Sequence, residues 1–252
     1  MPAVAAALPT TFRLHAGNLD TALRYEAVLR LLAERWQPGM AVLEVGSGAA
    51  GVTEFLAHPV TGIDPDFERT AERGTRWLER LPGRATALPV ADASFDAVLC
   101  VEMLEHLPTV EREPALREMI RALRSGGRLI VTFPADATAA KLDRWLDDAY
   151  RAWHGRPHPW VAEHLNEAYP RTADLLAALE RAGGAAARVQ VRKQLPARAF
   201  RGLHVVYTVY ANPLLTGRFA LGSPLVVRAV FGVLRRLRRG PCYRTILVLD
   251  KP

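Results

Sequence analysis

A glycine-rich turn constrains the fold of this chain more than any other feature. The six residues from Gly46 to Gly51 read GSGAAG and directly follow the apolar run Ala41–Val45. A run that is apolar without alternation is typical of a strand buried on both faces of a parallel sheet. Glycine lets the backbone turn sharply and approach a ligand with no Cβ atom in between. This combination predicts a nucleotide-binding α/β fold, although many such folds share it.

Similar apolar runs recur along the chain and alternate with stretches of helical periodicity. The further runs are Val60–Ile63, Ala97–Val101 and Arg128–Phe133, and the helical stretches are Leu19–Trp36, Val52–Ala57, Phe67–Leu81 and Arg112–Leu123. Strands and helices that alternate with short loops predict an α/β fold: a Rossmann-like, doubly wound sheet with helices on both faces.

After Pro134 the pattern is less regular. We expect helices over Ala139–Trp153 and Thr172–Ala182, an irregular segment over His154–Pro170, and the last strands at Ala187–Val191 and Thr245–Leu249. About fifty residues between those strands predict an insertion. The chain therefore divides as one domain of 1–252: an N-terminal helical cover (1–40), a core (41–134), a cap insertion (135–170) and a C-terminal part (171–252) with a basic helical insertion at about 196–241.

The charge is distributed unevenly along the chain. The net charge is +7, but from Gln190 onward there are 12 Lys or Arg residues against the single acid Asp250. The basic character therefore belongs to the C-terminal region. The two cysteines imply no disulfide framework and favour a reducing compartment. With no signal-peptide pattern and no apolar run long enough to span a bilayer, we expect a cytoplasmic protein.

Two carboxylates lie beside the glycine turn at the ends of buried strands. Asp64 ends the run Val60–Ile63, roughly 20 residues after the turn, where a carboxylate can accept both hydroxyls of a ribose. Glu44 precedes the turn, and a charge there is costly unless it is used. We expect Glu44 to organise the loop or to meet a ligand's ammonium group.

Three downstream blocks narrow the choice of family. They are LPVADASFDAV over 88–98, LEHL over 104–107 and LRSGGRLIV over 123–131. In this order the blocks resemble the type 11 methyltransferase domain family, the class I group that includes ubiquinone and menaquinone methyltransferases and many small-molecule methyltransferases. The resemblance covers about 41–133. It implies a seven-stranded sheet with an antiparallel last strand, and S-adenosyl-L-methionine as the methyl donor.

The resemblance also implies roles for individual positions. Gly46, Ser47, Gly48 and Gly51 match the loop along the methionine part of the cofactor, Asp64 matches the ribose-binding acid, Pro65 lies near the adenine, and Cys100, Val101 and Glu102 match backbone that faces the cofactor. The chain departs from the family where an acid usually meets the adenine amino group, because Arg84 stands in or near that place. We assign adenine recognition there to Thr86 or to backbone groups, Ala85 included.

Methyl transfer is an in-line displacement, so the protein mainly orients its ligands in a dry site and needs no metal. A general base helps only where the acceptor loses a proton. His106 is the candidate base, since it follows the fourth strand on the ligand side of the sheet; the alternative is that it caps or packs the next helix. Arg24 could pair with the cofactor carboxylate or could face solvent.

Two further segments leave alternatives open. His154, His158 and His164 could form a metal site, a substrate-facing cap that carries a base, or ordinary cap packing. The apolar and then basic segment 224–239 could be an interfacial helix at the inner membrane surface, a lid for an acidic or lipid-linked substrate, or a helix packed on the domain.

The function that the sequence favours is methyl transfer from S-adenosyl-L-methionine to a small or lipid-linked acceptor. The alternative is a non-catalytic cofactor-binding or regulatory protein of the same fold. A dinucleotide oxidoreductase would need a second nucleotide-binding half where the LEHL and Gly-Gly blocks stand. No nucleic-acid-binding module is visible, so we expect no nucleic-acid partner.

Overall fold

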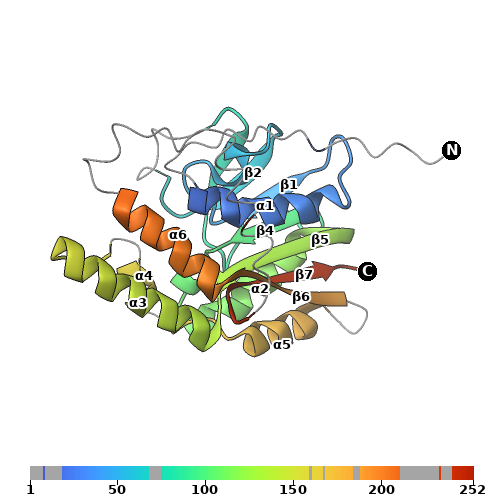
Figure 1. Cartoon of the computed structure of the whole chain (residues 1–252). Coiled ribbons are helices and arrows are strands. Elements are labelled where there is room, and N and C mark those ends of the chain that lie inside the picture. Colours follow the sequence, from blue (N-terminus) through green and yellow to red (C-terminus); the bar gives the residue numbers. More distant parts are fainter. Residues whose placement is uncertain are drawn as a thin grey trace.

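A twisted seven-stranded sheet forms the centre of the molecule (Figure 1). The computed structural model describes residues 8, 19–67, 75–158, 161–166, 168–183, 188–210, 233 and 240–252. The strand order is β3-β2-β1-β4-β5-β7-β6. The strands are β1 (Val42–Val45), β2 (Val60–Asp64), β3 (Leu78–Pro82), β4 (Phe95–Val101), β5 (Leu123–Pro134), β6 (Arg188–Pro196) and β7 (Cys242–Asp250).

Strand direction confirms the doubly wound topology. The pairs β2–β3, β1–β2, β1–β4 and β4–β5 are all parallel. The last strand, β7, lies between β5 and β6 and is antiparallel to both. The chain order reverses beside β1, between β1 and β4, which is the point where doubly wound sheets bind ligands at the carboxyl ends of their strands.

Helices cover both faces of the sheet, so the strands are apolar on both sides. Helix α1 (Leu19–Ala33) packs on one face against a cluster that includes Val42 and Leu99. Helices α2 (Thr109–Ala122) and α5 (Thr172–Gly183) pack on the other face against a cluster that includes Leu43 and Val98. Neighbouring residues of one strand thus enter opposite cores, which explains the unbroken apolar runs of the sequence.

Three helices extend beyond the end of the sheet as a cap (Figure 1). They are α3 (Asp136–His154), the short α4 (Val161–Asn166) and α6 (Ala197–Tyr210). They share a small core of their own, in which Leu142 and Leu146 of α3 pack with Phe200 of α6. Among the described residues, no helix combines the length and the apolar character needed to cross a bilayer.

The structure corrects three local expectations. β3 lies inside the stretch expected as the helix Phe67–Leu81, of which 68–74 are outside the described residues. This strand is at the sheet edge and buries only Leu78, so it has charged positions in place of an apolar run. The segment His154–Pro170, expected to be irregular, contains α4.

The third correction concerns Val52–Ala57. In place of that helix the chain forms a single 3₁₀ turn, η2 (Gly51–Glu54). The basic insertion expected at 196–241 begins with α6. Its basic segment 224–239 lies, apart from Val233, outside the described residues.

Candidate active site

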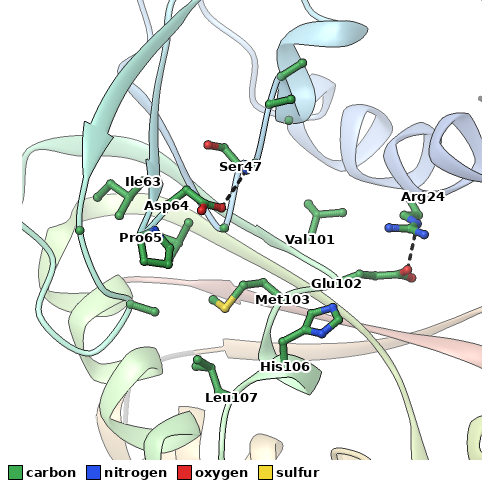
Figure 2. Close-up of a pocket in the computed structure, with 18 of the residues that line it drawn as sticks. Arg24, Ser47, Ile63, Asp64, Pro65, Val101, Glu102, Met103, His106 and Leu107 are labelled. Atoms are coloured by element: carbon green, nitrogen blue, oxygen red, sulfur yellow. Dashed lines mark hydrogen bonds and ion pairs between the residues drawn. The ribbon is translucent and has the colours of Figure 1, made fainter. Parts of the chain in front are cut away.

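One cavity of about 1010 Å³ opens at the carboxyl ends of β1, β2 and β4 (Figure 2). Its wall combines the glycine loop, the end of β2, the turn 83–86, the segment 101–107 and residues of α1. Small-molecule pockets typically measure about 300–1000 Å³, so this cavity is at the upper end of that range. It lies where a doubly wound sheet is expected to hold its ligand.

The glycine loop needs glycine for two separate reasons. Gly46 and Gly51 have φ angles of +78° and +52°, a region in which side chains are strained. A Cβ atom on Gly46 would also overlap with Met103 Cγ, and one on Gly51 would overlap with Glu44 Oε2. Substitution at either position would therefore combine backbone strain with steric overlap.

Glu44 stabilises the glycine loop through hydrogen bonds to its carboxylate. Its buried carboxylate accepts hydrogen bonds from the Tyr25 hydroxyl (2.7 Å) and from the Val52 backbone N–H (2.6 Å). Burial raises the pKa of Glu44 to about 7. Glu44 is not among the residues that line the cavity. We expected Glu44 either to organise the loop or to meet a ligand's ammonium group, and the geometry favours the first role. Its carboxylate connects Val52, which follows the loop, to Tyr25 of helix α1.

Asp64 presents its carboxylate to the cavity from the end of β2 (Figure 2). Oδ2 accepts the Gly48 backbone N–H and Oδ1 accepts the Asp66 backbone N–H, each at 3.0 Å. These two bonds fix the carboxylate in place. Each oxygen has a second lone pair, so the group can still accept the hydroxyls of a ribose.

Ser47 supplies a further polar group in the wall. Its side chain is buried, and its Oγ has no hydrogen-bond partner among the described residues. A buried hydroxyl of this kind costs free energy unless a ligand or water satisfies it. The Ser47 hydroxyl and the Asp64 carboxylate together fit S-adenosyl-L-methionine, which carries ribose hydroxyls that a carboxylate can accept and an amino-acid end that a hydroxyl can contact.

Glu102 connects the cavity wall to three other elements. It follows β4 with a φ angle of +50°, and its carboxylate contacts two guanidinium groups. Arg24 of α1 lies 2.9 Å away (Figure 2), and the fully buried Arg244 of β7 contacts the other oxygen. Arg244 also reaches Gln194 of β6. No sequence signal linked these residues, because they lie far apart in the chain.

The turn 83–86, to which we assign adenine recognition from the sequence, lies in the cavity wall. Ala85 and Thr86 line the wall. Arg84, the departure from the family pattern, also lines it, but its side chain is 72% exposed and lies 3.8 Å from Glu111. The Arg84 side chain therefore points largely into solvent, and Ala85 and Thr86 remain accessible to a ligand in the cavity.

His106 lines the cavity on the side opposite Asp64 in Figure 2. It is exposed and belongs to the 3₁₀ turn η4 (Leu104–His106) that follows β4. Its ring centre lies 5.1 Å from that of the buried His164 of α4. The other two cap histidines, His154 and His158, instead contact the ring of Tyr150. The three cap histidines therefore do not form one group.

Glu105 and Asp143 are buried acids beside these histidines that sequence reasoning did not single out. Asp143 Oδ2 accepts hydrogen bonds from Tyr169 (2.6 Å) and Tyr243 (3.1 Å), and lies 3.1 Å from His164 Nδ1. Neither oxygen of Glu105 has a hydrogen-bond partner among the described residues. Burial, and the nearby charge of Glu102, raise the pKa of Glu105 to about 8.

Most of the predicted site residues meet in this one wall. Those that line the cavity are Gly46, Ser47, Gly48, Gly51, Asp64, Pro65, Ala85, Thr86, Val101, Glu102 and His106. Arg24, expected to pair with the cofactor carboxylate or to face solvent, lines the cavity and pairs with Glu102.

Sequence comparisons point to one enzyme family. A family model described as "Methyltransferase domain" matches residues 43–131. A demethylmenaquinone methyltransferase of Mycobacterium marinum is 36% identical over 169 residues, which are 62% of this chain and 72% of the relative. The enzyme of the same name from Mycobacterium tuberculosis is 34% identical over 62% of this chain and 71% of its own length.

Solved structures share the fold. A phosphoethanolamine N-methyltransferase of Haemonchus contortus, solved with S-adenosyl-L-methionine, has a TM-score of 0.58 at 14% identity and covers 90% of this chain and 53% of its own. The [4+2]-cyclase SpnF has a TM-score of 0.55 at 21% identity over 90% of this chain and 81% of its own. These likenesses show the fold alone. The sequence relatives and the family match show that this chain belongs to the class I S-adenosyl-L-methionine-dependent methyltransferases, in the type 11 methyltransferase domain family.

Proposed function

We propose that this methyltransferase acts on a small, lipid-linked acceptor that binds beside the cofactor in the same cavity. The observation that carries the proposal is that one cavity of about 1010 Å³ has Asp64 on one side and His106 on the other. The names of the relatives support the acceptor class, since demethylmenaquinone is a small ring with a lipid tail.

The cofactor half of the cavity is the part nearest the glycine loop. S-adenosyl-L-methionine supplies a methyl group that its sulfonium already activates. We assign the ribose hydroxyls to Asp64 and the methionine part to the loop from Gly46 to Gly51. The adenine then lies beside Pro65, Ala85 and Thr86. Val101 and Glu102 form the floor, and Glu44 supports the loop through the Val52 N–H.

The acceptor half is formed by Met103, His106 and Leu107. Met103 and Leu107 provide apolar contact for a ring, and the imidazole of His106 can take a proton from an acceptor hydroxyl or an acidic carbon. A nitrogen acceptor that is already neutral needs no base, and His106 then only positions it. The reacting atom decides between these roles.

We further propose that the acceptor is delivered from the inner membrane surface. The support is the sequence of 224–239, which is apolar and then strongly basic, as in helices that lie on anionic lipid. We also propose that the chain works as one domain with the four parts that the sequence indicates: the helical cover, the core, the cap and the C-terminal part. In this arrangement the cap 135–170 would lie over the acceptor half.

A methyl-transfer assay with radiolabelled cofactor tests the acceptor class. The acceptor panel contains naphthoquinols and phenols, each tested with and without a polyprenyl tail. Phosphoethanolamine and histamine are added as amine acceptors. We expect turnover of a tailed ring, and a lower KM for the tailed than for the untailed form. Turnover confined to the amines would overturn the lipid-linked acceptor while leaving the family unchanged.

Vesicle sedimentation tests the membrane contact separately. We expect the protein to pellet with vesicles that contain phosphatidylglycerol and to be released by salt, since about 1 kcal/mol per basic residue is electrostatic. A variant in which Arg235, Arg236, Arg238 and Arg239 are replaced by Gln should stay in the supernatant. Equal pelleting of both proteins would contradict the contact.

A further inference from the structure

We propose that Glu105, His106 and His164 bind one divalent transition-metal ion, with Zn²⁺ as the best-fitting ion, at the acceptor side of the cavity. One potential ligand atom from each residue lies within 4.8 Å of the other two. In a tetrahedral site with bonds of about 2.1 Å, ligand atoms are about 3.4 Å apart. Small side-chain rotations would therefore close the three groups around an ion.

The charge balance around Glu105 favours a cation. Glu102 faces the guanidinium groups of Arg24 and Arg244. Asp143 accepts two tyrosine hydroxyls and lies against His164. Glu105 is only 3% exposed, and neither of its oxygens has a hydrogen-bond partner among the described residues. A buried carboxylate in that position is costly unless a proton or a metal ion compensates it.

Asp143 orients His164 as a metal ligand. Histidines that bind metals almost always donate their other ring N–H to a carboxylate or carbonyl, which fixes the tautomer. Here Nδ1 of His164 lies 3.1 Å from Asp143 Oδ2, and Tyr169 and Tyr243 hold that same oxygen in place. An ion would then coordinate through Nε2. This carboxylate–histidine pair is buried, as the outer support of a metal site commonly is.

The donor set selects the kind of ion. Two imidazoles and one carboxylate suit zinc and similar transition metals, whereas Mg²⁺ and Ca²⁺ prefer oxygen ligands alone. Three protein ligands also leave at least one coordination position open. Because His106 lines the cavity, that open position would face the acceptor.

The ion's role rests on the proposed function. A bound Zn²⁺ lowers the pKa of a coordinated hydroxyl and would help an acceptor oxygen lose its proton. The ion would then act in place of the His106 imidazole as a base, because a ring nitrogen that binds a metal cannot also accept a proton. Exposed His106 and buried His164 come from separate parts of the chain, on η4 and α4. The ion would therefore also fix the cap helix α4 against the end of β4.

Metal titration of the full-length, chelator-treated protein tests the site without any acceptor. Co²⁺ binding is followed by its visible d–d absorption and Zn²⁺ binding by calorimetry, in the wild type and in His106→Ala and Glu105→Gln. His154→Ala is the matched control, since it removes a cap histidine outside the cluster. Circular dichroism and S-adenosyl-L-methionine binding are measured on the same samples.

We expect one ion per chain in the wild type and in the control, and affinity at least about 100-fold weaker in each of the two ligand variants. No saturable binding by the wild type, or unchanged affinity in either ligand variant, would overturn the site. The cofactor measurement keeps the two proposals apart: failure to bind metal with normal cofactor binding removes the metal site alone.

Discussion

The two halves of the cavity are built in different ways. The cofactor half comes from short, local segments: the loop after β1 and the end of β2, in which Asp64 and Glu44 each have two hydrogen-bond partners. Beside the proposed acceptor half, η4 packs against the distant helix α4, and the carboxylate of Glu105 has no hydrogen-bond partner among the described residues. In the first half the two carboxylates are already held by hydrogen bonds and Ser47 Oγ is the polar atom without a partner, whereas in the second a buried carboxylate has none among the described residues.

This difference matches the division of labour in methyl transfer. A cofactor shared by a whole family can be held by a fixed backbone, so its site is encoded in a contiguous motif. An acceptor differs from one enzyme to the next, so elements outside the shared motifs, such as the cap helix α4 beside η4, can contribute to its site. The four predictions that follow separate the halves experimentally.

Replacing His106 by Asn should affect the acceptor half alone. We expect kcat to fall by about 10²–10⁴-fold, the range for loss of a general base or of an activating metal ligand. Cofactor affinity should change by less than about twofold, because His106 lies across the cavity from Asp64. Steady-state kinetics with an accepted substrate and calorimetry with the cofactor give the two values. A parallel loss of cofactor affinity would mean that the halves are not separate.

Replacing Asp64 by Ala should affect the cofactor half. Loss of two hydrogen bonds to a charged group, each worth about 1.5–3 kcal/mol, should weaken S-adenosyl-L-methionine binding by about 100-fold or more. Asp66→Ala, an exposed acid two residues away, is the matched control and should bind normally. Unchanged affinity in Asp64→Ala would remove the ribose assignment.

Glu44 gives the cofactor half a pH-dependent stability. Its folded pKa of about 7 lies above the ordinary glutamate value of 4.5, so the folded state favours the protonated form. The contribution of Glu44 to the free energy of unfolding is therefore fully present below about pH 4.5 and is lost as pH rises to about 7. The difference is about 3 kcal/mol.

Urea unfolding of the wild type and Glu44→Gln at several pH values measures this effect. The wild-type free energy minus that of the variant should fall between pH 4.5 and 7 and then level off. If the difference in the free energy of unfolding does not change between pH 4.5 and 7, burial does not raise the pKa of Glu44.

Replacing Arg84 by Ala should have the smallest effect. The side chain is largely exposed and its contact with Glu111 is long, at 3.8 Å. We expect cofactor affinity within about twofold of the wild type and a stability change below about 0.5 kcal/mol. A larger loss of affinity would mean that Arg84 itself recognises the cofactor, and that the departure from the family pattern is functional.

The same contrast explains what the sequence could predict. Buried strands such as Ala97–Val101 and the glycine turn leave local signals, so the sheet and the cofactor wall were predictable. The edge strand β3 was not, because only Leu78 is buried and the remaining positions follow no apolar pattern. Arg244 and Asp143 were not predictable either, since their partners lie 142 and 21 residues away and are brought close by folding alone.

The most direct test of this account is calorimetric titration of the wild-type protein with S-adenosyl-L-methionine and, separately, with NADH. We expect saturable 1:1 binding of S-adenosyl-L-methionine and no binding of NADH, because we assign one acid, Asp64, to a ribose, and the LEHL and Gly-Gly blocks stand where a second nucleotide-binding half would lie. Binding of NADH with no binding of S-adenosyl-L-methionine would contradict it.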